Sequence, residues 1–182
     1  AMQERSAAMS SMSCIYKYIG AFFIAAGSVA LGITPILSLK RHIALLEALC
    51  ASLRITAAEL GTRLRPLPEL IYELSERGGA AGGFYADIAR ELDSIGEKDF
   101  SGLWSAALDK LQFLSIDERE TLNELGAVLG RYELQEQLDS IGLCLDVLSR
   151  KALELRMEYP ERRRLILGLS AAAGFTTLIV LI

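Results

Sequence analysis

The side chains best suited to chemistry in this chain are one histidine and three cysteines. His42 could serve as the base beside a serine or cysteine nucleophile, but as the only histidine it cannot supply a metal site. The cysteines, Cys14, Cys50 and Cys144, lie far apart, and none forms the Cys-x-x-Cys spacing of a zinc or redox site. A di-iron bundle needs two Glu-x-x-His motifs, which one histidine cannot supply. We therefore expect no catalytic site, no metal and no cofactor, and buried or interfacial positions for these four side chains.

Carboxylate pairs and a glycine-rich run are the other patterns that could carry a reaction. Asp117 and Glu120 are spaced to share one helix face, but solvated helix faces commonly carry such pairs. The glycines between residues 78 and 83 could cradle a phosphate only if Gly-Lys-Ser or Gly-Lys-Thr followed them. Phe84 follows instead, so the run predicts a linker.

The charges of the chain are mixed in sign. Lys and Arg number 19 and Asp and Glu number 23, which gives a net charge of -4 at neutral pH. A nucleic-acid-binding domain usually carries a basic excess, and this chain has none. We therefore expect no nucleic acid among its partners.

Two long stretches without a charged side chain, residues 18–39 and 165–182, bracket the sequence. A helix that crosses the hydrocarbon core needs about 20 mainly apolar residues, and a range of about 17–25 is usable. Both stretches are long enough, and they account for the positive mean hydropathy of +0.32. The predicted organisation is an N-terminal tail over 1–17, a transmembrane helix over 18–39, a helical domain over 40–164 and a second transmembrane helix over 165–182.

The first stretch could instead be the apolar region of a cleaved signal peptide. Such a region is about 7–15 residues long and is followed by small residues at the cleavage site. Here the apolar run is longer, and Pro35, Ile36 and Leu37 follow the small residues. We therefore favour a retained anchor.

Basic side chains flank both stretches on the side of the central domain. Lys40 and Arg41 follow the first stretch, and three arginines at 162–164 precede the second. Lys and Arg close to a span stay in the cytoplasm, and these clusters outweigh Arg5 and Lys17 on the other side of the first stretch. We predict a cytoplasmic domain. The alternative is a two-anchor sensor or signalling protein whose helical domain lies outside the cytoplasm.

Between the two stretches the sequence favours helix throughout, so the predicted fold class is all-α: a helical bundle flanked by two transmembrane helices. Apolar residues recur at intervals of three and four, and no sustained alternation of period two appears. The expected helices are 43–60, continuous with the first span; one opened by Pro66; 84–95; one capped by Ser101; one started by Ser115 or Asp117; and 132–158.

Glycine and proline mark the predicted boundaries of these helices. Residues 61–65 are expected to form a break, and Pro160 is expected to separate the last helix from the second span. Gly126 is expected to permit a close contact between helices. Gly130 is expected to end its helix in a left-handed conformation.

Several short motifs lie along the chain in a characteristic order. They are Tyr-Ile-Gly-Ala at 18–21, Pro-Leu-Pro-Glu at 66–69, Leu-Gly-Ala-Val-Leu-Gly at 125–130, Gln137, and Leu-Gly at 167–168. In this order and spacing they resemble the stage III sporulation protein AB family of endospore-forming bacteria, over about residues 15–182. Two departures from the family pattern affect helix caps: Arg65 stands in place of a capping Thr, and residues 131–133 replace a Ser-Asp pair.

The resemblance implies a domain similar to the cytoplasmic domains of the type II secretion inner-membrane protein F. It also implies a place in the assembly that links mother cell and forespore, in the mother-cell membrane around the forespore. The expected neighbour is a cytosolic ATPase similar to secretion motors and to stage III sporulation protein AA. The chain would then be a non-enzymatic platform between this motor and a membrane channel.

Exposed charges at the end of the domain farthest from the membrane are the predicted contact surface for the ATPase. Because both anchors hold the outer helices at the membrane, this end should contain the turn after the first helix and the turn before the last. The candidate residues are Arg63, Arg65, Glu69, Arg131 and Glu133.

Small residues about four apart in the two spans predict close helix packing within the membrane. These surfaces would let the spans pack on each other, on a partner or on a second copy of the chain, which allows a homo-oligomer. The residues are Gly20, Ser28 and Gly32 in the first span and Gly168, Ser170, Ala172 and Gly174 in the second.

Overall fold

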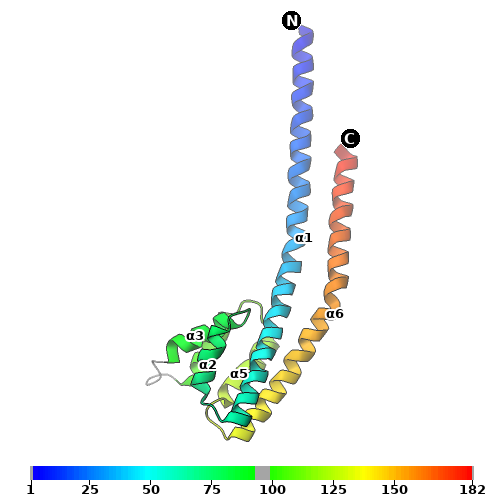
Figure 1. Ribbon diagram of the computed structural model, residues 1–182. Coiled ribbons are helices and arrows are strands. Elements are labelled where there is room, and N and C mark those ends of the chain that lie inside the picture. Colours follow the sequence, from blue (N-terminus) through cyan, green and yellow to red (C-terminus); the bar gives the residue numbers. More distant parts are fainter. Residues whose placement is uncertain (1, 93–98, 182) are drawn as a thin grey trace. The chain divides into compact units, whose positions relative to one another are not determined.

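The computed structural model describes residues 2–92 and 99–181, and these residues form helices joined by short connections (Figure 1). Within the first and last helices, most side chains of 2–33 and 167–181 lie outside the description. No strand occurs among the described residues, so the predicted all-α class is confirmed. The helices are α1 (Met2–Arg63), α2 (Leu67–Glu76), α3 (Gly82–Leu92), α4 (Phe100–Asp109), α5 (Ile116–Val128) and α6 (Leu134–Leu181).

The chain divides into two compact units. One comprises the residues up to Leu39 together with those from Glu158 onward, and the other is Lys40–Met157. The second unit, called here the helical unit, corresponds closely to the predicted domain over 40–164. It contains the core, the candidate sites and all of the contacts described below.

The core of the helical unit is built on the C-terminal part of α1 and the N-terminal part of α6, which lie side by side (Figure 1). Leu46 and Leu49 of α1 and Ile141 and Leu148 of α6 are all 0% exposed. Burying one such side chain contributes about 1.5–3 kcal/mol. The predicted apolar stripe of the last helix is confirmed, because all of its members belong to the core or pack against it: Leu134, Leu138, Ile141, Leu145, Leu148, Ala152 and Leu155.

Three aromatic rings form the centre of contact between α3 and α4. The ring of Phe84 meets those of Tyr85 and Trp104 edge to face, with centroids 4.9 and 4.8 Å apart. Each polar tip is satisfied in the interior. The Tyr85 hydroxyl lies 2.6 Å from Ser52 Oγ, and Trp104 Nε1 donates to the carbonyl of Leu122 at 2.8 Å.

Two glycines behave as the sequence predicted. A Cβ atom on Gly126 would lie 2.2 Å from Cδ1 of Trp104, so only glycine lets α5 approach α4 this closely. Gly130 has a φ of +78°, the left-handed conformation expected after the end of α5.

Several predicted helix boundaries are shifted. The break expected over 61–65 begins later, because α1 continues to Arg63 and residues 64–66 are non-helical. Pro66 is the N-cap of α2 and Leu67 its first helical residue. α3 begins at Gly82, two residues earlier than expected, and its predicted end at residue 95 lies outside the described residues.

The prediction that Ser101 caps α4 was wrong. The N-cap is Asp99, and Ser101 lies inside the helix with its hydroxyl bonded to Asp99 Oδ2 at 2.7 Å. Ser115, by contrast, is the N-cap of α5, as one of the two predicted alternatives had it.

The prediction that Pro160 ends the last helix was also wrong. α6 runs without interruption from Leu134 to Leu181, and α1 likewise contains Pro35. A proline inside a helix removes one hydrogen bond and costs about 3 kcal/mol. The helical turns on both sides of the proline keep their own backbone hydrogen bonds. A long helix can therefore continue through a proline, usually with a kink.

The two predicted transmembrane helices lie within α1 and α6, and most of their side chains fall outside the described residues. Within the described residues, no helix meets the length and apolar character needed to cross a membrane. Residues 2–17, predicted as a tail, belong to α1.

Candidate functional sites of the helical unit

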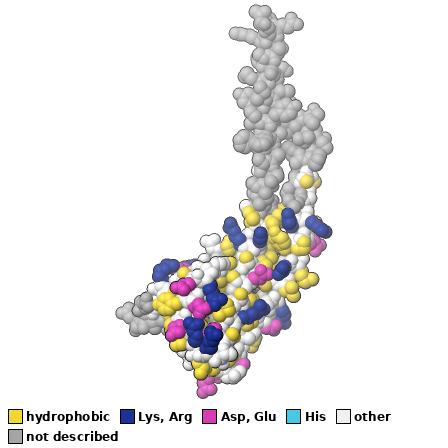
Figure 2. All heavy atoms as spheres, viewed as in Figure 1, with side chains coloured by type: hydrophobic (Ala, Val, Ile, Leu, Met, Phe, Trp, Pro, Cys, Tyr) yellow, Lys and Arg dark blue, Asp and Glu magenta, His cyan; other side chains and the backbone are white. Residues whose placement is uncertain are grey.

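The structure brings the five predicted contact residues to one end of the helical unit. Arg63 is the last residue of α1, Arg65 and Glu69 lie at the start of α2, and Arg131 and Glu133 lie in the α5–α6 connection. A Cβ on Gly130 would lie 3.5 Å from Leu67 Cδ2, so the α5–α6 connection lies beside the start of α2. We call these five residues the corner surface. Acidic and basic side chains are interspersed over the helical unit (Figure 2).

Arg65 is the central charge of the corner surface. Its Nη1 donates to Glu73 Oε2 at 2.7 Å, and its guanidinium lies 3.6 Å from both Glu59 Oε2 and Glu69 Oε2. Hydrogen bonds from Arg77 and then Arg65 lower the pKa of Glu73 below its usual value. Arg65 therefore joins α1 to α2, and it is more a structural tie than a free contact residue.

The sharp turn before Arg65 depends on an unusual residue. Leu64 has a φ of 53°, in the left-handed region that leucine rarely adopts, and its side chain is 70% exposed. Pro66, the N-cap of α2, has no side-chain acceptor for the first backbone N–H groups of the helix. The position where the family pattern has a capping Thr is thus occupied by the arginine that holds the turn through ion pairs.

The other corner residues are more exposed. Arg63 pairs with Glu59 at 3.1 Å, and Arg131 pairs with Asp99. A hydrogen bond from Ser101, and then the charge of Arg131, lower the pKa of Asp99. Glu133 is exposed. Surface ion pairs of this kind contribute about 0–1 kcal/mol, so these side chains can change partners at little cost.

Sequence reasoning missed a second site, which surrounds a buried carboxylate at the start of α5. Glu118 is 2% exposed, and with Ser115 it forms a reciprocal capping box. Glu118 Oε2 accepts from the backbone N–H of Ser115 and lies 2.8 Å from Nε2 of His42. The motif Ser115-x-x-Glu118 could have identified the cap, but nothing local indicated a partner 76 residues away.

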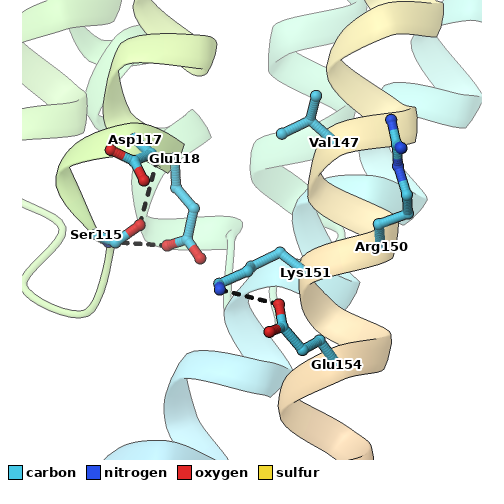
Figure 3. A pocket seen from close by; sticks show the side chains of 7 residues that line it. All are labelled: Ser115, Asp117, Glu118, Val147, Arg150, Lys151 and Glu154. Carbon is cyan, nitrogen blue, oxygen red and sulfur yellow. Dashed lines mark hydrogen bonds and ion pairs between the residues drawn. The ribbon is translucent and has the colours of Figure 1, made fainter.

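Glu118 lies at the edge of an open pocket of about 240 Å³ between α5 and α6 (Figure 3). On the α6 side, Lys151 pairs with Glu154 at 3.0 Å. Glu118 Oε1 is buried and has no hydrogen-bond partner among the described residues. The pocket is lined by Ser115, Asp117 and Glu118 on one side and by Val147, Arg150, Lys151 and Glu154 on the other.

This arrangement can bind a hydrogen-bond donor, but it is not built for nucleophilic catalysis. The hydroxyl of Ser115 accepts from the backbone N–H of Glu118 at 3.3 Å, and the described contact of His42 is to the carboxylate of Glu118. No group of three or more His, Cys, Asp or Glu side chains suited to a metal ion occurs in the described part of the chain.

The buried cysteines occupy the core, as expected. Cys50 and Cys144 are 4% and 2% exposed, and burial raises the pKa of both thiols, that of Cys144 to about 12. They are free thiols. Cys14 lies outside the residues whose side chains are described.

A protein-family model described as stage III sporulation protein AB matches residues 17–182. The chain belongs to the stage III sporulation protein AB family. A solved structure titled "Stage III sporulation protein AB" has 22% sequence identity and a TM-score of 0.55, covers 62% of this chain and 91% of that chain, and shows a similar fold. No match was found among curated proteins. The predicted resemblance is confirmed, and membership gives the chain a role related to sporulation.

Three of the five motifs that carried the resemblance to sporulation protein AB lie in the helical unit: 66–69, 125–130 and Gln137. Leu67 of the Pro-Leu-Pro-Glu motif lies beside Gly130, the last residue of the 125–130 motif, since a Cβ placed on Gly130 would be 3.5 Å from Leu67 Cδ2. Gln137 accepts from the backbone N–H of Gly130 at 3.1 Å and donates to the carbonyl of Tyr132 at 2.7 Å. In this family member, these three motifs therefore lie beside the corner surface, and Glu69 belongs to both.

The small residues predicted to pack within the membrane are only partly described. Gly168 and Ala172 are exposed, and no neighbouring atom lies within 4 Å of a Cβ placed on Gly168. The others, Gly20, Ser28, Gly32, Ser170 and Gly174, lie outside the residues whose side chains are described. Their packing stays a prediction.

Proposed function

We propose that this protein is a membrane-anchored, non-enzymatic platform of a secretion-like channel complex between mother cell and forespore. It would couple a cytosolic ATPase to the membrane channel during endospore formation. Family membership supports the sporulation role. The observation that supports the platform role is the corner surface, where three of the family-like motifs lie beside exposed charges.

The proposed anchors are the uncharged stretches 18–39 and 165–182. Their basic flanks, Lys40 with Arg41 and the arginines at 162–164, support a cytoplasmic position for the helical unit. The membrane would be that of the mother cell around the forespore. Small residues such as Gly168 and Ala172 would let the spans pack on each other, on partner spans or on a second copy.

We propose the corner surface as the ATPase contact, with different roles for its residues. Arg65 holds α1 and α2 together through three carboxylates, so its substitution would disturb folding as well as binding. Arg131 has one described ion pair and is 55% exposed, which makes it the better contact candidate. Arg63, Glu69 and Glu133 are its exposed neighbours.

The test replaces Arg131 with alanine and uses Arg156→Ala as the matched control. Both arginines are exposed, at 55% and 72%, and each has one described carboxylate partner. We expect Arg131→Ala to reduce co-purification of the ATPase at least severalfold and to impair spore formation. Arg156→Ala should do neither, and both variants should unfold at nearly the same temperature as the unaltered protein, because exposed pairs contribute little stability.

Equal ATPase binding by the two variants would remove the corner surface from the proposal. Normal sporulation in a strain that lacks the protein altogether would remove the platform role itself.

A further inference from the structure

Glu118 is a buried carboxylate whose two oxygens differ in environment. Oε2 accepts from the backbone N–H of Ser115 at 2.8 Å and lies 2.8 Å from His42 Nε2. Oε1 is buried and has no partner among the described residues. The capping box fixes the position of the side chain, so Oε1 cannot turn toward solvent without breaking these contacts.

An unpaired buried acceptor is costly. Leaving one unsatisfied costs about 1–3 kcal/mol, and more when the group is charged. Native proteins contain few such atoms, and each usually has a specific reason. The place of Glu118 in the lining of the pocket between α5 and α6 suggests one, because a donor that enters the pocket comes beside its carboxylate (Figure 3).

The size of the pocket limits what can enter. Its volume of about 240 Å³ is below the range of about 300–1,000 Å³ typical for pockets that hold cofactors and drug-sized ligands. A single side chain is a better match. Val147 supplies an apolar wall against which a methylene stem can lie.

The charges of the pocket favour a cation. Asp117, Glu118 and Glu154 contribute three carboxylates to its lining. The two cations of the lining already have partners: Arg150 pairs with Asp146 at 2.5 Å, and Lys151 pairs with Glu154 at 3.0 Å. With Asp146 included, four carboxylates face two cations, so the region carries an excess of negative charge.

We propose that this pocket receives an arginine side chain of a partner protein, whose guanidinium donates to Glu118 Oε1. Arginine is preferred over lysine because its planar fork can serve two carboxylates at once and is more weakly hydrated, so it enters a half-buried site at lower cost. The pocket is distinct from the corner surface. His42 and Arg63 are 21 residues apart on α1, which corresponds to about 30 Å. The proposal therefore stands whether or not the corner surface binds an ATPase.

The sole histidine of the chain provides the probe for a test, because its ring contacts Glu118 and gives one resolvable set of NMR signals. The full-length protein in detergent would be titrated at pH 7.5 with N-acetyl-arginine methylamide. The controls are the matching citrulline compound, which has the same shape without charge, and spermidine, a free cation without a guanidinium. We expect a saturable shift of the His42 ring signals with the arginine compound, in the millimolar range, and at least tenfold weaker responses to the other two.

Variants assign the response to the pocket. Glu118→Gln should weaken binding of the arginine compound at least tenfold, while Glu120→Gln, an exposed carboxylate two residues along α5, should leave it unchanged. If Glu118→Gln fails to fold, as judged by circular dichroism, Val147→Phe replaces it. This variant fills the pocket without touching the carboxylate and should also abolish binding.

Three results would overturn the proposal. They are the absence of a shift with the arginine compound, an equal shift with the citrulline compound or spermidine, and undiminished binding by Val147→Phe. The absence of a shift would mean that Oε1 is hydrogen-bonded within the molecule or by solvent alone.

Discussion

At Gly126 the absence of a side chain decides how closely two helices approach. The indole of Trp104, 1% exposed, occupies the space where a Cβ would lie, and its N–H is bonded to the carbonyl of Leu122. The indole thus cannot shift without losing a buried hydrogen bond. The tolerance of this contact for even one methyl group should be very low.

The first prediction is that Gly126→Ala lowers the free energy of unfolding by about 1–3 kcal/mol, the usual cost of overpacking a core. A Cβ at this position would lie 2.2 and 2.6 Å from two atoms of the Trp104 ring. Chemical denaturation in detergent measures the change. The matched control is Gly142→Ala in α6, where no atom lies within 4 Å of the new Cβ; it should stabilise the protein by about 0.5–1 kcal/mol. Equal effects of the two substitutions would contradict the packing argument.

The buried thiols make stability depend on alkaline pH. Burial raises the pKa of Cys144 to about 12 and also raises that of Cys50, whereas an unfolded cysteine ionises near about 8.5. A group whose pKa is raised on folding stabilises the folded state fully below the unfolded pKa. Its contribution falls as the pH rises from there toward the folded pKa.

We therefore expect the free energy of unfolding to fall between about pH 8.5 and 12, by up to about 1.4 kcal/mol per pH unit for each thiol that ionises only in the unfolded state. Denaturation curves recorded at several pH values would show the decline. The slope should become shallower in Cys144→Ala. An identical slope in that variant would show that other groups cause the decline.

Residue patterns allowed some partners to be foreseen and not others. The sequence identified the close contact at Gly126, because a glycine inside a helix leaves room for a neighbouring helix. It did not identify the contact of His42 with Glu118, since 76 residues separate them and each has an ordinary local explanation. For the same reason Arg65 was predicted as an exposed contact, although it meets carboxylates from two helices.

At the scale of the element, α5 shows how a short polar helix is positioned. Its first turn carries Asp117 and Glu118, which favour the positive end of the helix dipole, and Ser115 closes the capping box. The cap also fixes the carboxylate at the pocket. Capping and site geometry are therefore coupled in this helix.

We predict that Ser115→Ala destabilises the helical unit by about 1 kcal/mol, within the range of about 0.5–2 kcal/mol for lost N-caps. The hydroxyl that accepts from the N–H of Glu118 is removed. The thermal unfolding midpoint followed by circular dichroism gives the measurement. Ser115→Asn retains an acceptor and should recover most of the loss; if asparagine and alanine are equally destabilising, the hydroxyl does not act as a cap.

Helix faces were more predictable than helix ends. The apolar stripes of α2, α4 and α6 were found from their spacing because burial imposes that spacing over several turns. The position of a helix end depends on one or two capping residues, and neighbouring candidates differ in stability by only about 1 kcal/mol. For this reason Ser101 was predicted as the N-cap of α4, although Asp99 is the N-cap. Pro160 was expected to end α6 because a proline removes one backbone hydrogen bond of the helix. The long helix nevertheless continues through it on both sides.

At the scale of the whole molecule, the proposed orientation in the membrane rests on the charges that flank the two uncharged stretches. The family assignment gives the protein a sporulation role but does not fix on which side of the membrane the helical unit lies. Direct labelling can decide between the platform and the sensor alternative.

The prediction is that a cysteine at the exposed position Gly83 resists a membrane-impermeant thiol reagent in intact cells and reacts after the cells are opened. Basic flanking residues should hold the unit in the cytoplasm. Cys14 is replaced by serine in both proteins, because the predicted topology places it outside the cytoplasm. The protein without Gly83→Cys then supplies the background, which should be low because Cys50 and Cys144 are buried. Ready labelling in intact cells would place the unit outside and favour the sensor.

Trp104 also gives the molecule an optical signal of its own. It is the single tryptophan of the chain, and the centroid of its ring lies 6.4 Å from that of Tyr85 on α3. At this separation, light absorbed by Tyr85 passes efficiently to the indole. The part of the Trp104 emission that disappears in Tyr85→Phe therefore reports whether α3 still rests on α4. The wavelength of the Trp104 emission maximum reports whether the indole is shielded from water. One sample can therefore distinguish the loosening of this contact from global unfolding without an added dye.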